Sequence, residues 1–340
     1  MTTRLDSKPQ VWTLAADLGL PTSEKPSRTI VDFVTRRIRK ISKKFSCTCL
    51  NELLNATAGE VSTLFEEIHS DDDLRQIRLR YVSKGETAFA NLEEELSGSE
   101  DYAITIRRTH REGWEPQFVS VIDFRLDKVY RSYFSKWHEL AHLLTLTPQM
   151  RLVFRRTHST SAAQDPEERL MDVIASELGF FREFLPNEVG DDVSFEMIER
   201  IRQECCPAAS RQAAMIGIVK ALPQPCILIQ AEMALRKSEA ARATQMVMDM
   251  GLADPTPALR AVYVTVNDAA KEQGVNFHKN WRVPEESVIS RVFESGGYAA
   301  SLEDLSWWTT SGGSHLAAFP VMVKAKKNWN AVVALLVPRL

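Results

Sequence analysis

The sequence predicts an α+β protein, with a mainly helical part that carries a small sheet and a smaller C-terminal α/β part. Three observations lead to this fold class. Apolar residues recur at helical spacing through much of about the first 220 residues. Two short stretches on either side of Gly113 instead alternate between apolar and polar residues, which is typical of strands. Beyond the proline-containing stretch 253–257 the pattern changes to strands with one helix, so we place a domain boundary between about residues 240 and 257.

Size and composition are those of an ordinary globular protein, with 340 residues, 44% hydrophobic and 26% charged. The net charge of −3 argues against a protein that coats nucleic acid over its whole surface. We expect no membrane segment, because no apolar run approaches the roughly 20 residues that a membrane helix needs. The N-terminus lacks the features of a signal peptide, and five cysteines are an odd number. Together these features predict free thiols and a cytoplasmic location.

The first 27 residues predict an N-terminal arm, because polar residues are scattered among three prolines. Residues 28–45 predict a helix with one apolar face. That face consists of Ile30, Val31, Val34, Ile38 and Ile41. The opposite face is basic and consists of Arg36, Arg37, Arg39, Lys40, Lys43 and Lys44. We interpret the basic face as a solvated surface, with a contact to nucleic acid or to an acidic partner as the alternative.

The middle of the chain predicts helices around a pair of strands. Residues 58–97 predict helix, since apolar residues recur there at helical spacing. The first of these positions are Val61, Leu64, Phe65 and Ile68. Residues 102–107 and 118–125 predict two strands. A helix at about 128–146 follows, and its apolar neighbours predict that it is buried. These neighbours are Phe134, Trp137, Leu140, Leu143 and Leu144.

A polar connector at about residues 147–165 leads into another helix. Asp165 is a favoured N-cap residue and Pro166 fits the first helical turn, so the helix begins there and ends before Pro186. Further along we expect helices at 194–204 and 209–221, a strand at 226–230, strands at 259–266, 316–323 and 331–337, and a helix around 285–294.

The strongest functional signal is the five-residue stretch from His138 to His142, which has the HExxH pattern of zinc hydrolases. Two histidines four residues apart lie on the same face of a helix, so both rings can reach one metal ion. Glu139 is rotated by about 100° from His138 around the helix, which places it beside the metal and not on it. A glutamate in that position can accept a proton from metal-bound water.

A catalytic zinc needs one more protein ligand and an open position for water. Glu168, on the following helix, is the predicted third ligand, with Glu167 as an alternative. Asp172 lies four residues after Glu168 on the same helical face. It could accept a hydrogen bond from the ring nitrogen of a ligand histidine that faces away from the metal. Glu168 also occupies the position of a capping-box partner for Asp165, and Asp172 could be a simple solvated charge.

These ligands predict a zinc ion that polarises a carbonyl group and lowers the pKa of its bound water to about 7. Glu139 would take the proton of that water and later deliver it to the leaving amine. The developing oxyanion needs a further donor, for which His158, Tyr130 and Tyr133 remain open. None of the five cysteines is at a spacing that indicates a second metal site.

The stretches FSKWHELAHLL and EERLMDVIASELGFFREFLP resemble the ImmA/IrrE-type metallopeptidases. Position by position, His138, Glu139 and His142 match the zinc helix of this family, and Glu168 matches its third ligand. Asp172 stands where the family usually has asparagine. Ala175 and Pro186 match the small residue and the terminal proline of the second helix, whereas Met171 replaces the common alanine.

The resemblance implies a zincin-like metallopeptidase domain over residues 28–245, after an arm at 1–27. A looser similarity extends to the tail, where LRAVYVTVNDAAKEQG, NWRVPEESVIS and LSWWTTSGG resemble the GAF-like sensor domain of long family members. This implies a GAF-like domain over 250–340. The aromatic and basic residues of this domain also suit binding of single-stranded DNA. The simpler interpretation is that the aromatic residues belong to the core and rim of the domain. The aromatic residues are Phe277, His278, Trp281, Tyr298, Trp307, Trp308 and Trp329, and the basic residues are Lys279, Arg282, Lys324, Lys326 and Lys327.

Such peptidases cleave a partner helix-turn-helix repressor in response to stress, DNA damage or a phage signal. The resemblance therefore implies a cytoplasmic zinc endopeptidase whose C-terminal domain binds single-stranded DNA or a small molecule. One alternative is a signal-sensing or nucleic-acid-sensing transcriptional regulator whose zinc site is structural or vestigial. Another is an unrelated zinc hydrolase that acts on a small amide, because HExxH does not specify a peptide substrate.

Overall fold

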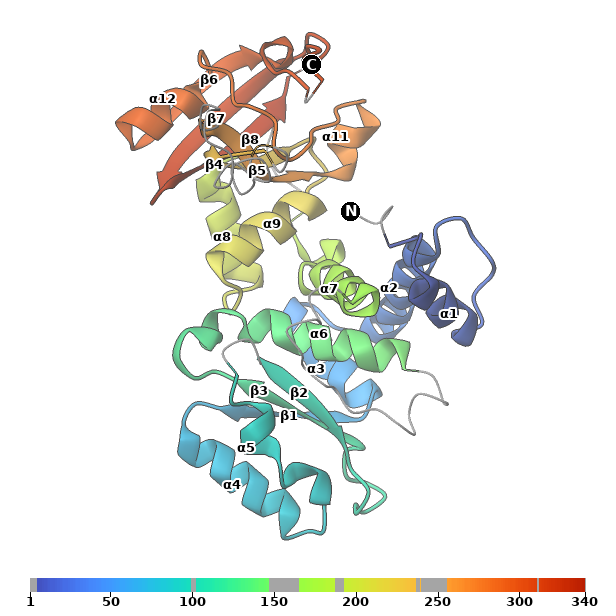
Figure 1. Ribbon diagram of the computed structural model, residues 1–340. Helices are drawn as coiled ribbons and strands as arrows, with labels where there is room; N and C mark the ends of the chain where they lie inside the picture. Colours follow the sequence, from blue (N-terminus) through green and yellow to red (C-terminus); the bar gives the residue numbers. More distant parts are fainter. Residues whose placement is uncertain are drawn as a thin grey trace, which may run out of the picture. The chain divides into compact units, whose positions relative to one another are not determined.

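The computed structural model of the chain describes residues 5–98, 102–146, 165–186, 193–236, 239, 256–310 and 312–339. Two compact units can be distinguished (Figure 1). The first comprises Met1–Leu185 and Arg202–Gly217, and the second comprises Pro186–Ile201 and Ile218–Leu340. Both combine helices with a small sheet, which confirms the predicted α+β class. No helix among the described residues is both long and apolar enough to cross a membrane.

The first unit begins with three helices, α1 (Pro9–Asp17), α2 (Pro26–Phe45) and α3 (Leu50–Glu60). The presence of α1 differs from the loose arm expected for residues 1–27. Pro9 fits the first turn of α1, and the helix buries three apolar residues, Val11, Leu14 and Ala15. α2 buries the whole predicted apolar face. Its basic face is partly engaged within the unit, in contacts of Arg37 with the Leu144 carbonyl, Arg39 with Glu183 and Lys44 with Glu60.

A three-stranded sheet follows, in the order β1-β3-β2, with β1 (Thr63–Ile68), β2 (Ala103–Arg107) and β3 (Phe118–Asp123). β1 runs parallel to β3, and β2 runs antiparallel to it. The expectation of helix throughout 58–97 is wrong at β1. Leu64 is 43% exposed there, so the helical spacing of the apolar residues does not mark one buried face. Helical structure resumes at α4 (Asp71–Val82), η2 (Thr87–Phe89) and α5 (Leu92–Glu95).

Two helices pack directly against each other in this unit, α6 (Ser132–Thr145) and α7 (Pro166–Gly179). The turn η3 (Leu126–Tyr130) precedes α6, and η6 (Arg182–Phe184) follows α7. The Tyr133 hydroxyl donates a hydrogen bond of 2.6 Å to the Gly179 carbonyl. A Cβ atom at Gly179 would lie 3.0 Å from the ring of Trp137, which is fully buried. The absence of a side chain at Gly179 therefore allows the end of α7 to approach α6 closely.

The second unit contains an antiparallel sheet in the order β5-β4-β8-β7-β6. Its strands are β4 (Ile227–Ala234), β5 (Ala258–Val266), β6 (Tyr298–Asp304), β7 (Pro320–Asn328) and β8 (Ala331–Pro338). The helix α12 (Val288–Ser295) packs against β6, β7 and β8, and α11 (Asp268–Glu272) and η7 (Leu305–Trp307) are short. The helices α8 (Phe195–Cys205) and α9 (Arg211–Ala221) contribute residues to both units.

The second unit is not the continuous segment 250–340 that the sequence suggests. β4 pairs with both β5 and β8, so this sheet includes residues before the expected boundary. The boundary region itself, at about 240–257, lies mostly outside the described residues. β6 is a strand that the sequence did not indicate. Its sequence YAASLED lacks a run of β-branched residues, and pairing with β7 forms it.

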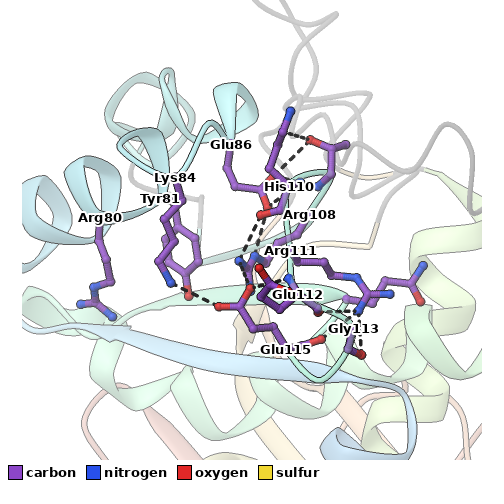
Figure 2. A network of polar contacts seen from close by, with 12 residues as sticks. Arg80, Tyr81, Lys84, Glu86, Arg108, His110, Arg111, Glu112, Gly113 and Glu115 are labelled. Carbon is purple, nitrogen blue, oxygen red and sulfur yellow. Dashed lines mark hydrogen bonds and ion pairs between the residues drawn. The ribbon is translucent and has the colours of Figure 1, made fainter.

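A buried polar network joins the loop between β2 and β3 to the residues after α4 (Figure 2). Arg108 lies 3.1 Å from Glu86 and 2.8 Å from Glu115, and the side chains of Arg108 and Glu86 are buried. Glu86 also accepts the backbone N–H groups of Thr109 and His110. Because each charge faces an opposite charge or a backbone donor, the network holds the loop without an isolated buried ion.

The network predicts a pH-dependent contribution to stability. The backbone N–H of Glu112 and the guanidinium of Arg108 lower the pKa of Glu115 to about 2. A carboxylate with a lowered folded-state pKa stabilises the protein above its unfolded pKa of about 4.3, and this contribution is lost as the pH falls through the folded pKa. We expect urea unfolding midpoints of the wild type to fall more steeply between about pH 4 and pH 2 than those of Glu115→Gln. Parallel pH profiles for the two proteins would contradict this assignment.

Candidate metal centre

The helix α6 holds His138 and His142 on one buried face. They are four positions apart in the sequence, and their Nε2 atoms lie 3.1 Å apart. The rings are held by a helix whose other neighbours, Trp137, Leu140 and Ala141, are fully buried. The predicted juxtaposition of the two imidazoles thus follows from helical geometry together with burial of the surrounding apolar residues.

The helix α7 brings a carboxylate to the same point. Asp165 caps this helix by accepting the backbone N–H of Glu167 at 2.8 Å. Glu168 lies in the first turn of the helix, and its Oε2 is 3.2 Å from Nε2 of His138, while its Oε1 is 3.4 Å from Nε2 of His142. His138, His142 and Glu168 form a group that could hold a metal ion.

The chemistry and spacing of this donor set fit a divalent metal. Asp172 Oδ1 lies 2.9 Å from Nδ1 of His138, so Nδ1 donates to this carboxylate. In the neutral ring Nε2 then carries a lone pair, and this lone pair faces the carboxylate of Glu168. The lone pair and the carboxylate repel each other, and a cation between the two would attract both. Ligands about 2.0–2.1 Å from a tetrahedral zinc are themselves about 3.3 Å apart, which is close to the three separations of 3.1, 3.2 and 3.4 Å.

Glu139 is separate from this group and fully buried. Its Oε2 accepts a hydrogen bond of 2.7 Å from the hydroxyl of Thr105 on β2. Sequence reasoning did not identify Thr105. The sequence contains one relevant signal, because Thr105 is a polar residue within the otherwise apolar stretch Ala103–Ile106 of a buried strand. Its contact with α6 arises only when the sheet and the helix pack together.

The other candidate residues have different surroundings. Glu167 lies outside the metal-binding group, and burial followed by the nearby negative charges of Asp165 and Glu168 raises its pKa. Tyr133 donates its hydroxyl to Gly179, and burial raises its pKa, so it is engaged away from the metal-binding group. Tyr130 is exposed on η3. His158 and the connector at 147–164 lie outside the described residues.

The two adjacent glutamates give a matched test of the ligand set. We expect Glu168→Gln to lose most of its zinc after dialysis, because an amide is a much weaker zinc ligand than a carboxylate. Glu167→Gln should retain about the zinc content of the wild type. Zinc per chain is measured by inductively coupled plasma mass spectrometry. Loss of zinc from Glu167→Gln with retention in Glu168→Gln would show that the wrong glutamate has been assigned.

The contact between Asp172 and His138 should tune metal affinity. Without this acceptor, His138 loses the hydrogen bond that fixes its tautomer and ring orientation. We expect Asp172→Ala to bind zinc about 10- to 100-fold more weakly than the wild type, in competition with a chromophoric chelator. Asp127→Ala, a change of another acidic residue in the same unit, serves as the control. Equal zinc affinity in Asp172→Ala and the wild type would mean that Asp172 is only a surface charge.

Comparisons with known proteins add little to this geometry. No family model matches the chain, and no curated protein matches it. A solved structure of a Mycobacterium tuberculosis transcriptional regulator aligns with 92% of this chain and 82% of its own, at 12% sequence identity and a TM-score of 0.37. A likeness at this TM-score carries no argument about fold or function.

Proposed function

We propose that this chain is a zinc-dependent endopeptidase of the ImmA/IrrE type, with Glu139 as its general base. The observation that carries the proposal is the convergence of His138, His142 and Glu168 from α6 and α7 within hydrogen-bonding distances of one another. Helix α6 has the HExxH pattern, and the third ligand comes from the next helix along the chain. That combination is typical of zinc hydrolases, which leave one position of the metal open.

Each residue then has a defined role. His138, His142 and Glu168 would hold the ion, and Asp172 fixes the orientation of His138. A zinc ion bound there would act as a Lewis acid toward a carbonyl oxygen and lower the pKa of a water molecule to about 7. Glu139 accepts a proton from the attacking water and delivers it to the leaving amine.

The proposed substrate is a helix-turn-helix transcriptional repressor, which would be cut in response to stress, DNA damage or a phage signal. This part of the proposal is supported by the resemblance of the α6 and α7 sequences to ImmA/IrrE-type peptidases. The second unit would be the GAF-like sensor, with a small molecule or single-stranded DNA as its signal. We place the reaction in the cytoplasm, where such repressors act.

The predicted aromatic residues of the second unit fall into a buried group and an exposed group. Phe277, Trp281 and Trp308 are buried, and the ring of Phe277 contacts both indoles, as expected of core residues. The exposed members of the set are His278, Tyr298, Trp307 and Trp329, the last of them 92% exposed at the turn between β7 and β8. These four exposed rings could stack on bases or pack on a small molecule, so the proposal keeps both classes of signal.

A transcriptional regulator with a structural zinc site remains the second candidate function. The observation that favours it is the basic face of α2, where Arg36, Lys40 and Lys43 are exposed. Exposed basic side chains on one helix face suit contacts with DNA phosphates. This candidate requires binding of duplex DNA that weakens steeply with salt and is reduced by changing these three residues to glutamine.

The peptidase proposal predicts that Glu139→Gln keeps its zinc but loses cleavage, because the amide cannot accept the proton from water. The test enriches new protein N-termini from cells that express the wild type or Glu139→Gln, after DNA damage or phage challenge. We expect a new N-terminus within a helix-turn-helix protein in the wild type alone, with about one zinc per purified chain in both proteins.

Two results would contradict this proposal. Equal cleavage by Glu139→Gln would remove the general-base role of this residue. Absence of any new N-terminus in challenged wild-type cells, together with salt-dependent DNA binding by the purified chain, would favour the regulator with a structural zinc site.

A further inference from the structure

A line of three buried hydroxyl groups crosses the sheet of the first unit and ends at Glu139. Thr63 on β1, Ser120 on β3 and Thr105 on β2 lie on neighbouring strands, and Thr105 is directly opposite Ser120 in the β2–β3 register. The oxygen of Ser120 lies 3.1 Å from that of Thr63 and 2.6 Å from that of Thr105. Thr105 then donates to Oε2 of Glu139 at 2.7 Å.

The direction of these hydrogen bonds follows from a count of protons. A carboxylate only accepts, so Thr105 uses its single hydroxyl proton on Glu139. The Thr105 oxygen must then accept from Ser120, and Ser120 in turn must accept from Thr63. All donors along the line point toward the carboxylate. Such a chain strengthens its last bond, because each donor polarises the next.

Packing of the strand alone does not explain the hydroxyl of Thr105. Valine has the shape of threonine without its hydroxyl and is favoured in strands, so the packing of β2 alone does not require a polar side chain at position 105. Three buried hydroxyls aligned on one carboxylate instead match the needs of a fully buried acid, whose charged form requires donors.

We propose that Thr105 is a positioning residue for Glu139, supported through Ser120 by Thr63. Its hydrogen bond to Oε2 fixes the rotation of the carboxylate, so that Glu139 is already oriented when water and substrate bind. This inference rests on the proposed function, because orientation matters for turnover only if Glu139 accepts a proton. The contact itself can be tested without any substrate.

The first experiment is a double-mutant cycle in the metal-free full chain. It combines Thr105→Val, which removes the hydroxyl at constant shape, with Glu139→Met, which removes the acceptor at similar length. Unfolding in urea is followed by amide exchange in α6, so that the signal comes from the first unit. We expect Thr105→Val to lower the midpoint in the wild-type background and to change it much less in the Glu139→Met background. A merely structural hydroxyl would give the same shift in both.

Thr57 provides a matched control in the same unit. It is a fully buried threonine on α3, and its hydroxyl has no hydrogen-bond partner among the residues that the structure describes. We expect Thr57→Val to leave the urea midpoint unchanged or to raise it, and to show no coupling with Glu139→Met. An equal and additive loss in Thr105→Val and Thr57→Val would overturn the proposal.

The second experiment measures turnover of the protein that the wild type cleaves. We expect Thr105→Val to lower kcat about 10- to 100-fold with KM and zinc content unchanged, since a misplaced catalytic group slows the reaction without weakening binding. Thr105→Ser, which restores the hydroxyl, should recover most of kcat.

If Glu139→Gln is inactive while Thr105→Val turns over like the wild type, the positioning role is wrong and the peptidase proposal stands. If Glu139→Gln is active, the peptidase proposal fails, and the double-mutant cycle still decides whether the contact exists.

Discussion

Two imidazole nitrogens 3.1 Å apart, both within 3.4 Å of one carboxylate, set the main constraint on the first unit. Neutral nitrogens at this separation repel through their lone pairs unless a proton or a metal ion lies between them. The contact of Nδ1 of His138 with Asp172 places a ring proton on the far side of that ring. A divalent cation held there would relieve this repulsion, because it would attract both nitrogens and the carboxylate at once.

Packing of α6 against α7 and against the sheet holds His138, His142 and Glu168 in this arrangement. Tyr133 and Gly179 join α6 to α7 near the end of α7, and the lack of a side chain at Gly179 lets the two helices approach. On the sheet side, the Thr105 hydroxyl donates a hydrogen bond to the carboxylate of Glu139. α6 is thus engaged on one side by α7, which supplies Glu168, and on the other by the sheet, which contacts Glu139. One helix can direct His138 toward α7 and Glu139 toward the sheet, because consecutive helical residues point in directions about 100° apart.

Much of the candidate site could be predicted from the sequence, because its spacing is local. Helical geometry alone places His138 and His142 on one face of a helix. The N-cap at Asp165 fixes where the next helix begins, and this start places Glu168 and Asp172 on one face of that helix. Thr105 could not be predicted, because its role depends on how β2 packs against α6. The strand β1 was missed because its apolar spacing also fits a helix, and only the exposure of Leu64 separates the two. Likewise, no local pattern indicates that β4 joins the sheet of the second unit.

The most direct measurement of the central claim is anomalous X-ray scattering at the zinc edge from crystals grown with added zinc. The account predicts one strong peak about 2 Å from Nε2 of His138, Nε2 of His142 and a carboxylate oxygen of Glu168. A map with no peak between these residues, or with the zinc held elsewhere in the chain, would contradict it.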